Sequence, residues 1–375
     1  MASAAAVDAT FTASALGWLL STTPAHNLDR RSNNFDALRL LAAWLVLFSH
    51  CYPISGQKVA DPFNRIVGLD TFGGVGVAIF FVLSGYLVTL SWQRSSGDAS
   101  FLWKRVRRIY PALIVCVLLC TVLLGPLLTK LDTAAYFTHP LTKDYLRTAS
   151  AWRIHYVLPA VFEGNPVGSA VNGSLWSLPY EIRCYCALVL IGLLPFALRW
   201  KALVVVAVLS SMLLLRPAMP PANPFDHVFG LDYYMVKLGL YFAIGASYAC
   251  WSHRVGPLWW AGVIAVCLTW FLPDSGLRNL LWVASFSALV LGVALDVPRL
   301  PKLPDRMGDW SYGLYLYAFP LQQVLALFAV QHTFGFMGYV ALSTLLSLAA
   351  AAFSWFLVER PALSVEWPLW RARIA

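Results

Sequence analysis

FDALRLLAAWLVLFSH, residues 35–50, is an apolar run of the kind that crosses a membrane as a helix, yet it carries an arginine and a histidine. At about 100° per residue, the spacing between Arg39 and His50 is roughly three full helical turns, so both side chains point to the same side. The rise between them is about 16 Å, roughly half the thickness of a bilayer core. Asp36 lies within roughly 40° of the same line. Alone, Arg39 fits a snorkelling arginine and His50 a structural histidine, but together on one stripe they predict a polar cavity.

The chain as a whole is also rich in apolar residues. Of its 375 residues, 59% are hydrophobic and 12% are charged, roughly half the charged fraction of a soluble globular protein. The apolar runs are continuous, whereas the strands of a membrane β-barrel alternate apolar and polar residues. These features predict an all-α, polytopic membrane protein.

About ten apolar runs of roughly 17 to 22 residues are candidate transmembrane helices. They lie near residues 35–55, 72–92, 109–128, 174–196, 201–216, 230–250, 257–273, 279–296, 310–330 and 337–357. When the loops alternate between two sides, Lys and Arg concentrate on the side that holds both chain ends, which predicts cytoplasmic termini. The chain then divides into an N-terminal cytoplasmic tail of residues 1–32, a membrane domain of residues 33–360 and a C-terminal cytoplasmic tail of residues 361–375.

Several other classes of protein are disfavoured by the sequence. The net charge of +9 comes mainly from short loops, where membrane orientation explains it, so no nucleic-acid partner is expected. Seven cysteines, an odd number, fall mainly within the spans and indicate neither a disulfide framework nor a metal site. The absence of GxSxG, Walker, HExxH and CxxC motifs disfavours the usual hydrolases and ATP-driven pumps.

The segment FLWKRVRRIYP, residues 101–111, is expected to be a cytoplasmic loop that leads into the third span. Its four basic residues fit an orientation signal that touches anionic lipid. A second interpretation is a binding site, because Arg105 and Arg108 share one face of a nascent helix and offer two planar guanidinium groups suited to phosphate.

NGSLWSLPYEIRCY, residues 172–185, begins the span that re-enters the membrane from the outside. Asn172 or Ser174 is expected to be the N-cap, and Pro179 is expected to kink the first turns. Glu181 then lies within the span, and we predict a partner on another helix. The candidates are His50, Arg39 and Lys237. A purely structural ion pair is the alternative.

Weaker signals lie elsewhere in the chain. FFVLSGYLV, residues 80–88, places Ser84 and Tyr86 in the second span, where the intervening glycine allows close helix packing. DWSYGLYLYAFPLQQ, residues 309–323, places Tyr315 near the mouth of the ninth span, and an interfacial aromatic belt explains most of this pattern. FLVERPA, residues 356–362, is compatible with a simple helix stop. The long segment 129–173 is expected to be an outer loop that carries short helices over the outer mouth and influences the choice of acceptor.

These segments together resemble the acyltransferase family 3 of integral membrane acyltransferases over residues 33–360. The resemblance rests on six elements in the same order: Arg39-x10-His50, FFVLSGYL, the F-x3-R-x2-R-I-x-P pattern of residues 101–111, GSLWSLPYE ending in Glu181, SYGLYLY and ERP. It implies a multi-pass protein of the bacterial inner membrane. Such proteins transfer an acyl group, commonly acetyl from acetyl-CoA, to a hydroxyl of an extracytoplasmic glycan or lipid-linked sugar. Some members carry an additional SGNH-type esterase domain, and this chain is expected to be the membrane domain alone.

The resemblance also implies roles for particular residues. Arg39, Arg105 and Arg108 are expected to bind the phosphates of acetyl-CoA, whose arm of about 15 to 20 Å matches the length of the stripe. His50 is the expected catalytic residue, either as a general base or as the group that takes the acyl itself. Glu181 is expected to orient the imidazole or to bind acceptor hydroxyls. Further candidates for substrate binding are Ser84, Tyr86, Trp176 and Tyr315.

A thioester is already activated, so neither a metal nor a permanently bound cofactor is expected. The expected partners are acyl-CoA, the glycan or lipid-linked sugar, membrane lipid and the machinery of polysaccharide synthesis. Two alternatives keep the same buried charges: an exporter that passes acyl groups to a separate transferase, and a small-solute transporter. The lack of internal repeats weighs against the transporter. A structural subunit would explain none of the buried charges.

Overall fold

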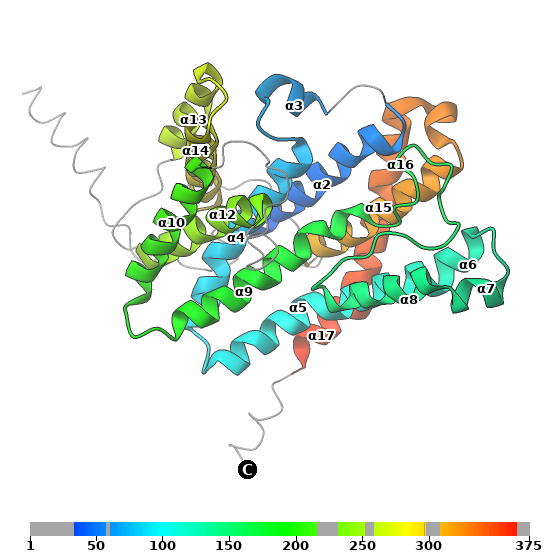
Figure 1. The fold of residues 1–375 in the computed structure, drawn as a ribbon, viewed down its shortest axis with the longest axis horizontal. Helices are drawn as coiled ribbons and strands as arrows, with labels where there is room; N and C mark the ends of the chain where they lie inside the picture. The colour runs from blue at the N-terminus through cyan, green and yellow to red at the C-terminus, as the bar shows by residue number, and fades with distance from the viewer. Residues whose placement is uncertain are drawn as a thin grey trace, which may run out of the picture. The chain divides into compact units, whose positions relative to one another are not determined.

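The computed structural model describes residues 34–57, 61–215, 232–251, 259–295, 297 and 308–365 (Figure 1). Within these ranges every regular element is a helix, and the one β feature is an isolated bridge between Val157 and Ala170. The prediction of an all-α protein is therefore confirmed. The tail of residues 1–32 and most of the tail of residues 361–375 lie outside the described residues.

Six helical segments of the described chain are long and apolar enough to cross a membrane. They are Phe35–Ile54 (α2), Phe72–Gln93 (α4), Asp98–Leu128 (α5 to α6), Leu198–Leu215 (α10), Gly276–Leu295 (α14) and Val330–Ser364 (α16 to α17). Each coincides with an expected span. The other expected spans are also helical: Leu178–Gly192 (α9), Tyr233–Trp251 (α12), Trp259–Leu268 (α13) with Thr269–Phe271 (η4), and Ser311–Leu327 (α15). A multi-pass membrane protein follows, whereas the number of about ten spans and the cytoplasmic termini stay predictions.

The chain forms two compact units. The first contains residues 82–90 of α4 together with α10, α12, α13 and α14. Within it, α4 and α12 approach so closely that only glycine fits: a Cβ on Gly85 would lie 2.0 Å from the carbonyl oxygen of Phe242, and one on Gly245 would lie 2.2 Å from that of Val82. Such small-residue contacts are the usual way in which membrane helices pack.

The second unit contains most of α2, the rest of α4 and the helices from α5 to α9 and from α15 to α17. The short helix Pro62–Val67 (α3) follows α2, and α16 (Val330–Ser354) follows α15 after a left-handed residue, Ala329. Two π-helical turns interrupt the long segments: Leu119–Leu124 (η1) between α5 and Gly125–Leu128 (α6), and Trp355–Glu359 (η5) between α16 and Arg360–Ser364 (α17). The ERP sequence therefore does not stop the helix, because α17 continues directly from η5.

The segment 129–173 contains short helices, as the sequence indicated, whereas its position on the outer side stays a prediction. It contains Thr133–Thr138 (α7), Pro140–Arg147 (α8) and Thr148–Ser150 (η2), and Figure 1 shows α8 alongside α5. Tyr136 Oη donates to the carbonyl of Thr121 at 2.8 Å, and Tyr110 Oη donates to that of Ser150 at 2.9 Å. The segment thus folds back along α5 as far as Tyr110, two residues after Arg108.

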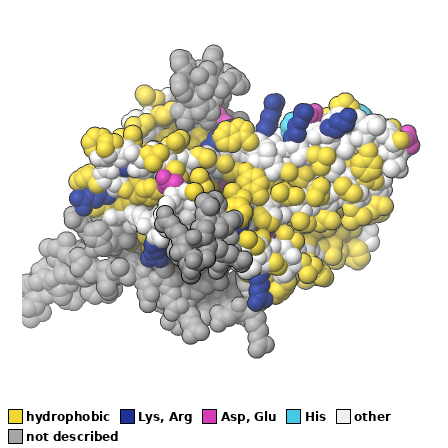
Figure 2. Space-filling view, turned by 90° about the horizontal axis from the view of Figure 1, so that it is seen from below, with side chains coloured by type: hydrophobic (Ala, Val, Ile, Leu, Met, Phe, Trp, Pro, Cys, Tyr) yellow, Lys and Arg dark blue, Asp and Glu magenta, His cyan; other side chains and the backbone are white. Residues whose placement is uncertain are grey.

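The basic segment is also placed differently from the expectation. Residues 101–111 are not a loop, because α5 begins at Asp98 and carries them as regular helix. Farther along the same segment, Leu118, Leu119, Val122 and Leu123 are 44 to 58% exposed. Figure 2 shows hydrophobic side chains gathered over a broad face, with Lys and Arg toward its edges. An apolar surface of this kind fits contact with lipid hydrocarbon.

Candidate functional site

The three arginines predicted to bind the donor line one cavity of the second unit, which we call the arginine cavity. Arg39 comes from α2, and Arg105 and Arg108 lie one turn apart on α5. The cavity has a volume of about 60 Å³, which admits a few water molecules or one phosphate-sized group but not a whole coenzyme A. Its other lining residues come from α4, α5, the 3-10 turn Gly173–Ser177 (η3), α9 and α15: Phe80, Phe81, Ile109, Ser177, Leu178, Glu181, Tyr185, Ser311, Tyr312 and Tyr315.

One buried carboxylate ties two of these arginines together. Arg39 Nη1 donates to Asp309 Oδ2 at 3.1 Å, and Arg108 Nη2 donates to the same oxygen at 2.5 Å. The other oxygen, Oδ1, accepts from the backbone N–H of Ser311 at 3.1 Å and from the Ser311 hydroxyl. Burial by itself raises the pKa of Asp309, but Arg108 and Arg39 outweigh that effect and hold the pKa well below its usual range. Asp309 is therefore ionised at neutral pH.

A second acid approaches Arg108 from the end of η5. Glu359 Oε2 lies 3.9 Å from Arg108 Nη1, and Glu359 Oε1 accepts from Ser354 Oγ at 2.9 Å. Glu359 is 2% exposed. The ERP sequence, which on its own was compatible with a helix stop, thus supplies an ion-pair partner to the arginine cavity.

Arg105 has different surroundings. Its guanidinium carbon lies 5.7 Å from the ring centre of Phe101 and 5.9 Å from that of Tyr185. Its Nη2 lies 3.4 Å from Ser91 Oγ, and its buried Nε has no hydrogen-bond partner in the described part of the chain. Aromatic faces can hold a guanidinium in place without neutralising it.

Glu181 belongs to the arginine cavity as well, where it accepts a hydrogen bond from Tyr185 Oη. The side chains lining this cavity do not include His50. The sequence predicted a partner for Glu181 on another helix, with Arg39 among the candidates. Arg39 lines the same cavity, but the hydrogen bond to Tyr185 lies within α9, so the partner on another helix stays a prediction. Orientation of the imidazole by Glu181 stays a prediction.

His50 lies half-buried on α2, where two residues from other elements contact it. Its Nδ1 is 3.4 Å from Ser174 Oγ, and its ring meets the ring of Phe319 edge-on at 5.1 Å between centres. Ser174 belongs to the 3-10 turn Gly173–Ser177 (η3). A Cβ on Gly173 would lie 2.5 Å from the Phe319 ring, so glycine at this position allows η3, α15 and α2 to meet.

Tyr315 connects the arginine cavity with this turn. It lines the cavity, its hydroxyl lies 2.8 Å from Ser177 Oγ, and it donates to the carbonyl of Ser174. The cavity and His50 are therefore linked through Tyr315 and Ser174.

The expected caps of this segment are wrong in detail. Asn172 stands at the N-cap position of η3 but makes no capping bond; its Nδ2 donates instead to the carbonyl of Leu316 at 2.9 Å. Ser177 stands at the N-cap position of α9, also without a capping bond. Pro179 lies in the first turn of α9, where its missing N–H has no helical acceptor to lose, so it begins the helix rather than kinking it.

The remaining candidates for substrate binding lie outside the arginine cavity. Ser84 and Tyr86 are buried in the first unit, where Tyr86 stacks on Phe35. Trp176 lies half-buried in η3 with its ring against Tyr180. Their contact with substrate stays a prediction.

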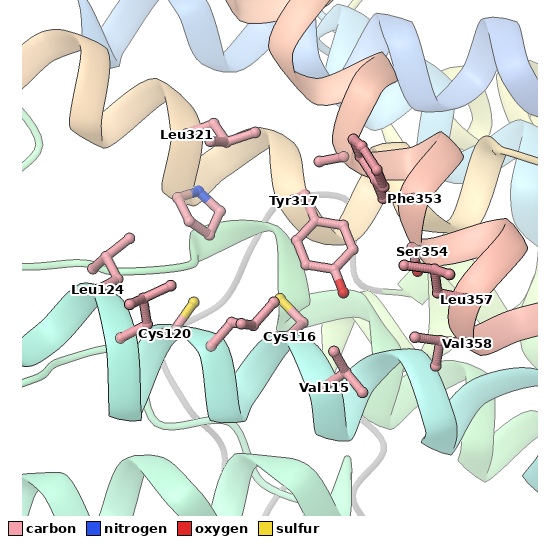
Figure 3. A pocket seen from close by; sticks show the side chains of 14 residues that line it. Val115, Cys116, Cys120, Leu124, Tyr317, Leu321, Phe353, Ser354, Leu357 and Val358 are labelled. Atoms are coloured by element: carbon pink, nitrogen blue, oxygen red, sulfur yellow. The ribbon is translucent and has the colours of Figure 1, made fainter.

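A larger hollow of about 400 Å³ opens between α5, α15 and the α16–η5 segment (Figure 3). Figure 3 shows Cys116 and Cys120 on one wall, facing Tyr317 and Leu321, with Phe353 and Ser354 on another. No charged side chain lines it, so it does not suit an anionic donor. Ser354 of this hollow contacts Glu359, which in turn approaches Arg108.

Asp309 is the residue of this site that the sequence did not single out. Its signal was a lone acid directly before the ninth span, inside a segment noted for its tyrosines. An unexplained charge at the boundary of an apolar span is reason to expect a partner on a neighbouring helix.

Comparison with known proteins gives consistent results. The chain matches the family described as an acyltransferase domain over residues 32–359. It is 32% identical to a protein named O-acetyl transferase from Shigella phage Sf6, over 90% of this chain and 98% of the relative. It is 33% identical to nodulation protein 10 from Rhizobium leguminosarum bv. viciae, over 92% of this chain and 96% of the relative. A protein named regulator of hypoxia-inducible factor 1 from Caenorhabditis elegans is 24% identical over half of this chain and 40% of its own length. No solved structure matches the chain.

Proposed function

Because the chain belongs to the acyltransferase domain family and is therefore a membrane acyltransferase, we propose that it moves an acetyl group from cytosolic acetyl-CoA to a glycan hydroxyl. The acceptor is a polysaccharide outside the cytoplasm or a lipid-linked sugar, and the membrane is the inner membrane of a bacterium. The relative named O-acetyl transferase supports acetyl as the group and oxygen as the acceptor atom, because its match extends over nearly the whole of both chains.

The observation that carries the proposal is the convergence of Arg39, Arg105 and Arg108 on one cavity that Tyr315 connects to His50. Coenzyme A presents three phosphate groups, and planar guanidinium groups bind phosphate through paired, charge-assisted hydrogen bonds. A donor whose anionic end binds there can direct its thioester along α2 toward the histidine, over a rise of about 16 Å.

His50 then handles the proton of the acceptor. In the base mechanism, the hydroxyl oxygen attacks the thioester carbon, the C–S bond breaks, and His50 passes the hydroxyl proton to the departing thiolate. In the covalent mechanism, the imidazole attacks the thioester carbon, the C–S bond breaks and the thiolate of coenzyme A departs. The acceptor hydroxyl then attacks the acetyl carbon, the C–N bond to the imidazole breaks, and the hydroxyl proton passes to the released imidazole. In the tautomer with the proton on Nδ1, which lies 3.4 Å from Ser174 Oγ, the lone pair of Nε2 would serve either role.

We assign the choice of acceptor to the segment 129–173, which is the longest connection between the expected spans and folds back along α5. Exchanging it for the equivalent segment of a relative should change the glycan that is acetylated and leave the use of acetyl-CoA unchanged. An unchanged acceptor would assign this choice elsewhere.

The proposal is tested with membranes that contain the protein and its native glycans, supplied with acetyl-CoA labelled in the acetyl group. Label is followed separately into protein, glycan and free acetate. The wild type and His332→Ala, an exposed histidine of α16 outside the site, should label glycan, and His50→Ala should not. Equal labelling by His50→Ala would remove the catalytic assignment. Label that crosses the membrane without entering glycan would favour the exporter, which shares the donor site.

A further inference from the structure

Asp309 occupies an unusual position for an acid in a site that is expected to bind anions. Its Oδ2 accepts from Arg39 at 3.1 Å and from Arg108 at 2.5 Å, while its Oδ1 accepts from Ser311 at the start of α15. One carboxylate, 4% exposed, therefore joins α2, α5 and α15. Its two arginine partners are 270 and 201 residues away in the sequence.

The carboxylate is buried and does not line the arginine cavity. Arg39, Arg108 and Ser311 line the arginine cavity, but Asp309 does not. A guanidinium has five N–H donors in a fixed plane, so a bond to Asp309 on one side leaves donors that can face the cavity. An anion that enters the cavity is bound next to the arginines and does not need to displace Asp309.

The charge of Asp309 also explains how two positively charged residues, Arg39 and Arg108, can lie close together in the lining of the arginine cavity. Both guanidinium groups approach a single oxygen, so they lie close enough to repel each other strongly at low dielectric. A negative charge between them removes that repulsion and fixes both planes. Arg105 also lines this cavity, but aromatic rings rather than a carboxylate hold its guanidinium group.

We propose that Asp309 is the positioning residue of the donor site: by holding Arg39 and Arg108 on one carboxylate oxygen, it presents both guanidinium groups to a phosphate group of acyl-CoA. This inference rests on the proposed function, since it takes acyl-CoA as the ligand of the arginine cavity. Asp309 itself does not touch the donor.

Asp309→Asn is the sharpest variant, because asparagine keeps the size of the side chain and an oxygen for the N–H of Ser311 but removes the negative charge. Affinity for coenzyme A is measured by calorimetry on the purified full-length protein, and kinetics are measured with two donors, acetyl-CoA and acetyl-pantetheine. For acetyl-CoA, we expect the dissociation constant of coenzyme A and the KM to rise at least tenfold, with kcat changed less than threefold. For acetyl-pantetheine, which lacks phosphates, wild type and variant should have the same KM.

Two further variants separate positioning from folding. Asp132→Asn removes the charge of a helix-capping carboxylate that accepts from the N–H of Ala135 at the start of α7, and it should leave affinity for coenzyme A unchanged. Asp309→Glu keeps the charge and should restore part of the affinity, which also supplies a folded protein if Asp309→Asn proves unstable.

Unchanged or tighter binding of coenzyme A by Asp309→Asn would overturn the inference, and tighter binding would mean that Asp309 competes with the donor. An equal rise of KM for acetyl-pantetheine would also overturn it, because that result indicates general distortion. Failure of the wild type to bind coenzyme A would refute the donor assignment itself, and the inference with it.

Discussion

Arg105 is the arginine of the cavity whose charge is least compensated, because it packs on aromatic rings and forms no ion pair among the described residues. Its loss should remove charge-assisted hydrogen bonds to phosphate, each worth about 1.5 to 3 kcal/mol. We therefore expect Arg105→Ala to raise the KM for acetyl-CoA about tenfold or more, measured in steady-state assays.

Arg107 provides a matched control for this prediction. It lies on the same helix, but it donates to the backbone carbonyls of Leu363 and Val365 and does not line the cavity. Arg107→Ala should leave the KM for acetyl-CoA as it is in the wild type. Equal effects of the two substitutions would assign the basic segment to orientation or lipid contact rather than to the donor.

The face of a helix on which a residue lies could be predicted from the sequence, because helical geometry alone determines it. The spacing of Arg39 and His50 predicts one face of α2, and between them Ala43 and Leu47 are fully buried on that face. Asp309 was not predictable in the same way, because its partners lie on other helices and hydropathy contains no information on which helices pack together. The N-caps were wrong because Asn172 uses its side chain for a contact with α15 instead.

At the scale of elements, η3 determines how His50 is held. The hydroxyl of Ser174, which belongs to η3, faces Nδ1 of His50. Tyr315, which lines the arginine cavity, donates a hydrogen bond to the carbonyl of Ser174 and so holds the turn in place. Ser174→Ala removes one hydrogen bond, worth about 0.5 to 1.5 kcal/mol. We expect kcat to fall about two- to tenfold with the KM for acetyl-CoA unchanged, measured in the same assay.

The control for this substitution is Ser211→Ala, which removes a hydroxyl that bonds within its own helix in the first unit. Its kcat should equal that of the wild type. A rise in the KM of Ser174→Ala with no change in kcat would contradict a role for η3 in holding His50.

The sequence predicts helices well because an apolar run must satisfy its backbone internally in a membrane. Each expected span is helical within the described residues. The segment 129–173 was harder to predict, since its α8 is polar enough to read as a surface helix, and its packing against α5 depends on tertiary bonds such as that from Tyr110 to Ser150. Residues 101–111 were predicted to be a loop because they carry four charges, but α5 begins at Asp98 and contains them.

At the scale of the whole molecule, the central claim is that a donor on one side of the membrane reaches an acceptor on the other. Membership in the acyltransferase family fixes the class of reaction, and six helical segments suited to crossing a membrane fix its setting. We propose that the path between the two sides follows the face of α2 that carries Arg39 and His50, with the arginine cavity at one end.

The most direct measurement uses sealed vesicles that contain the protein in one orientation, with acceptor glycan enclosed inside and labelled acetyl-CoA added outside. The vesicles are prepared so that the face assigned to the cytoplasm is external. The account predicts that label reaches the enclosed glycan with the wild type and not with His50→Ala. Acetylation that requires donor and acceptor on the same face, or that proceeds at the same rate without His50, would contradict it.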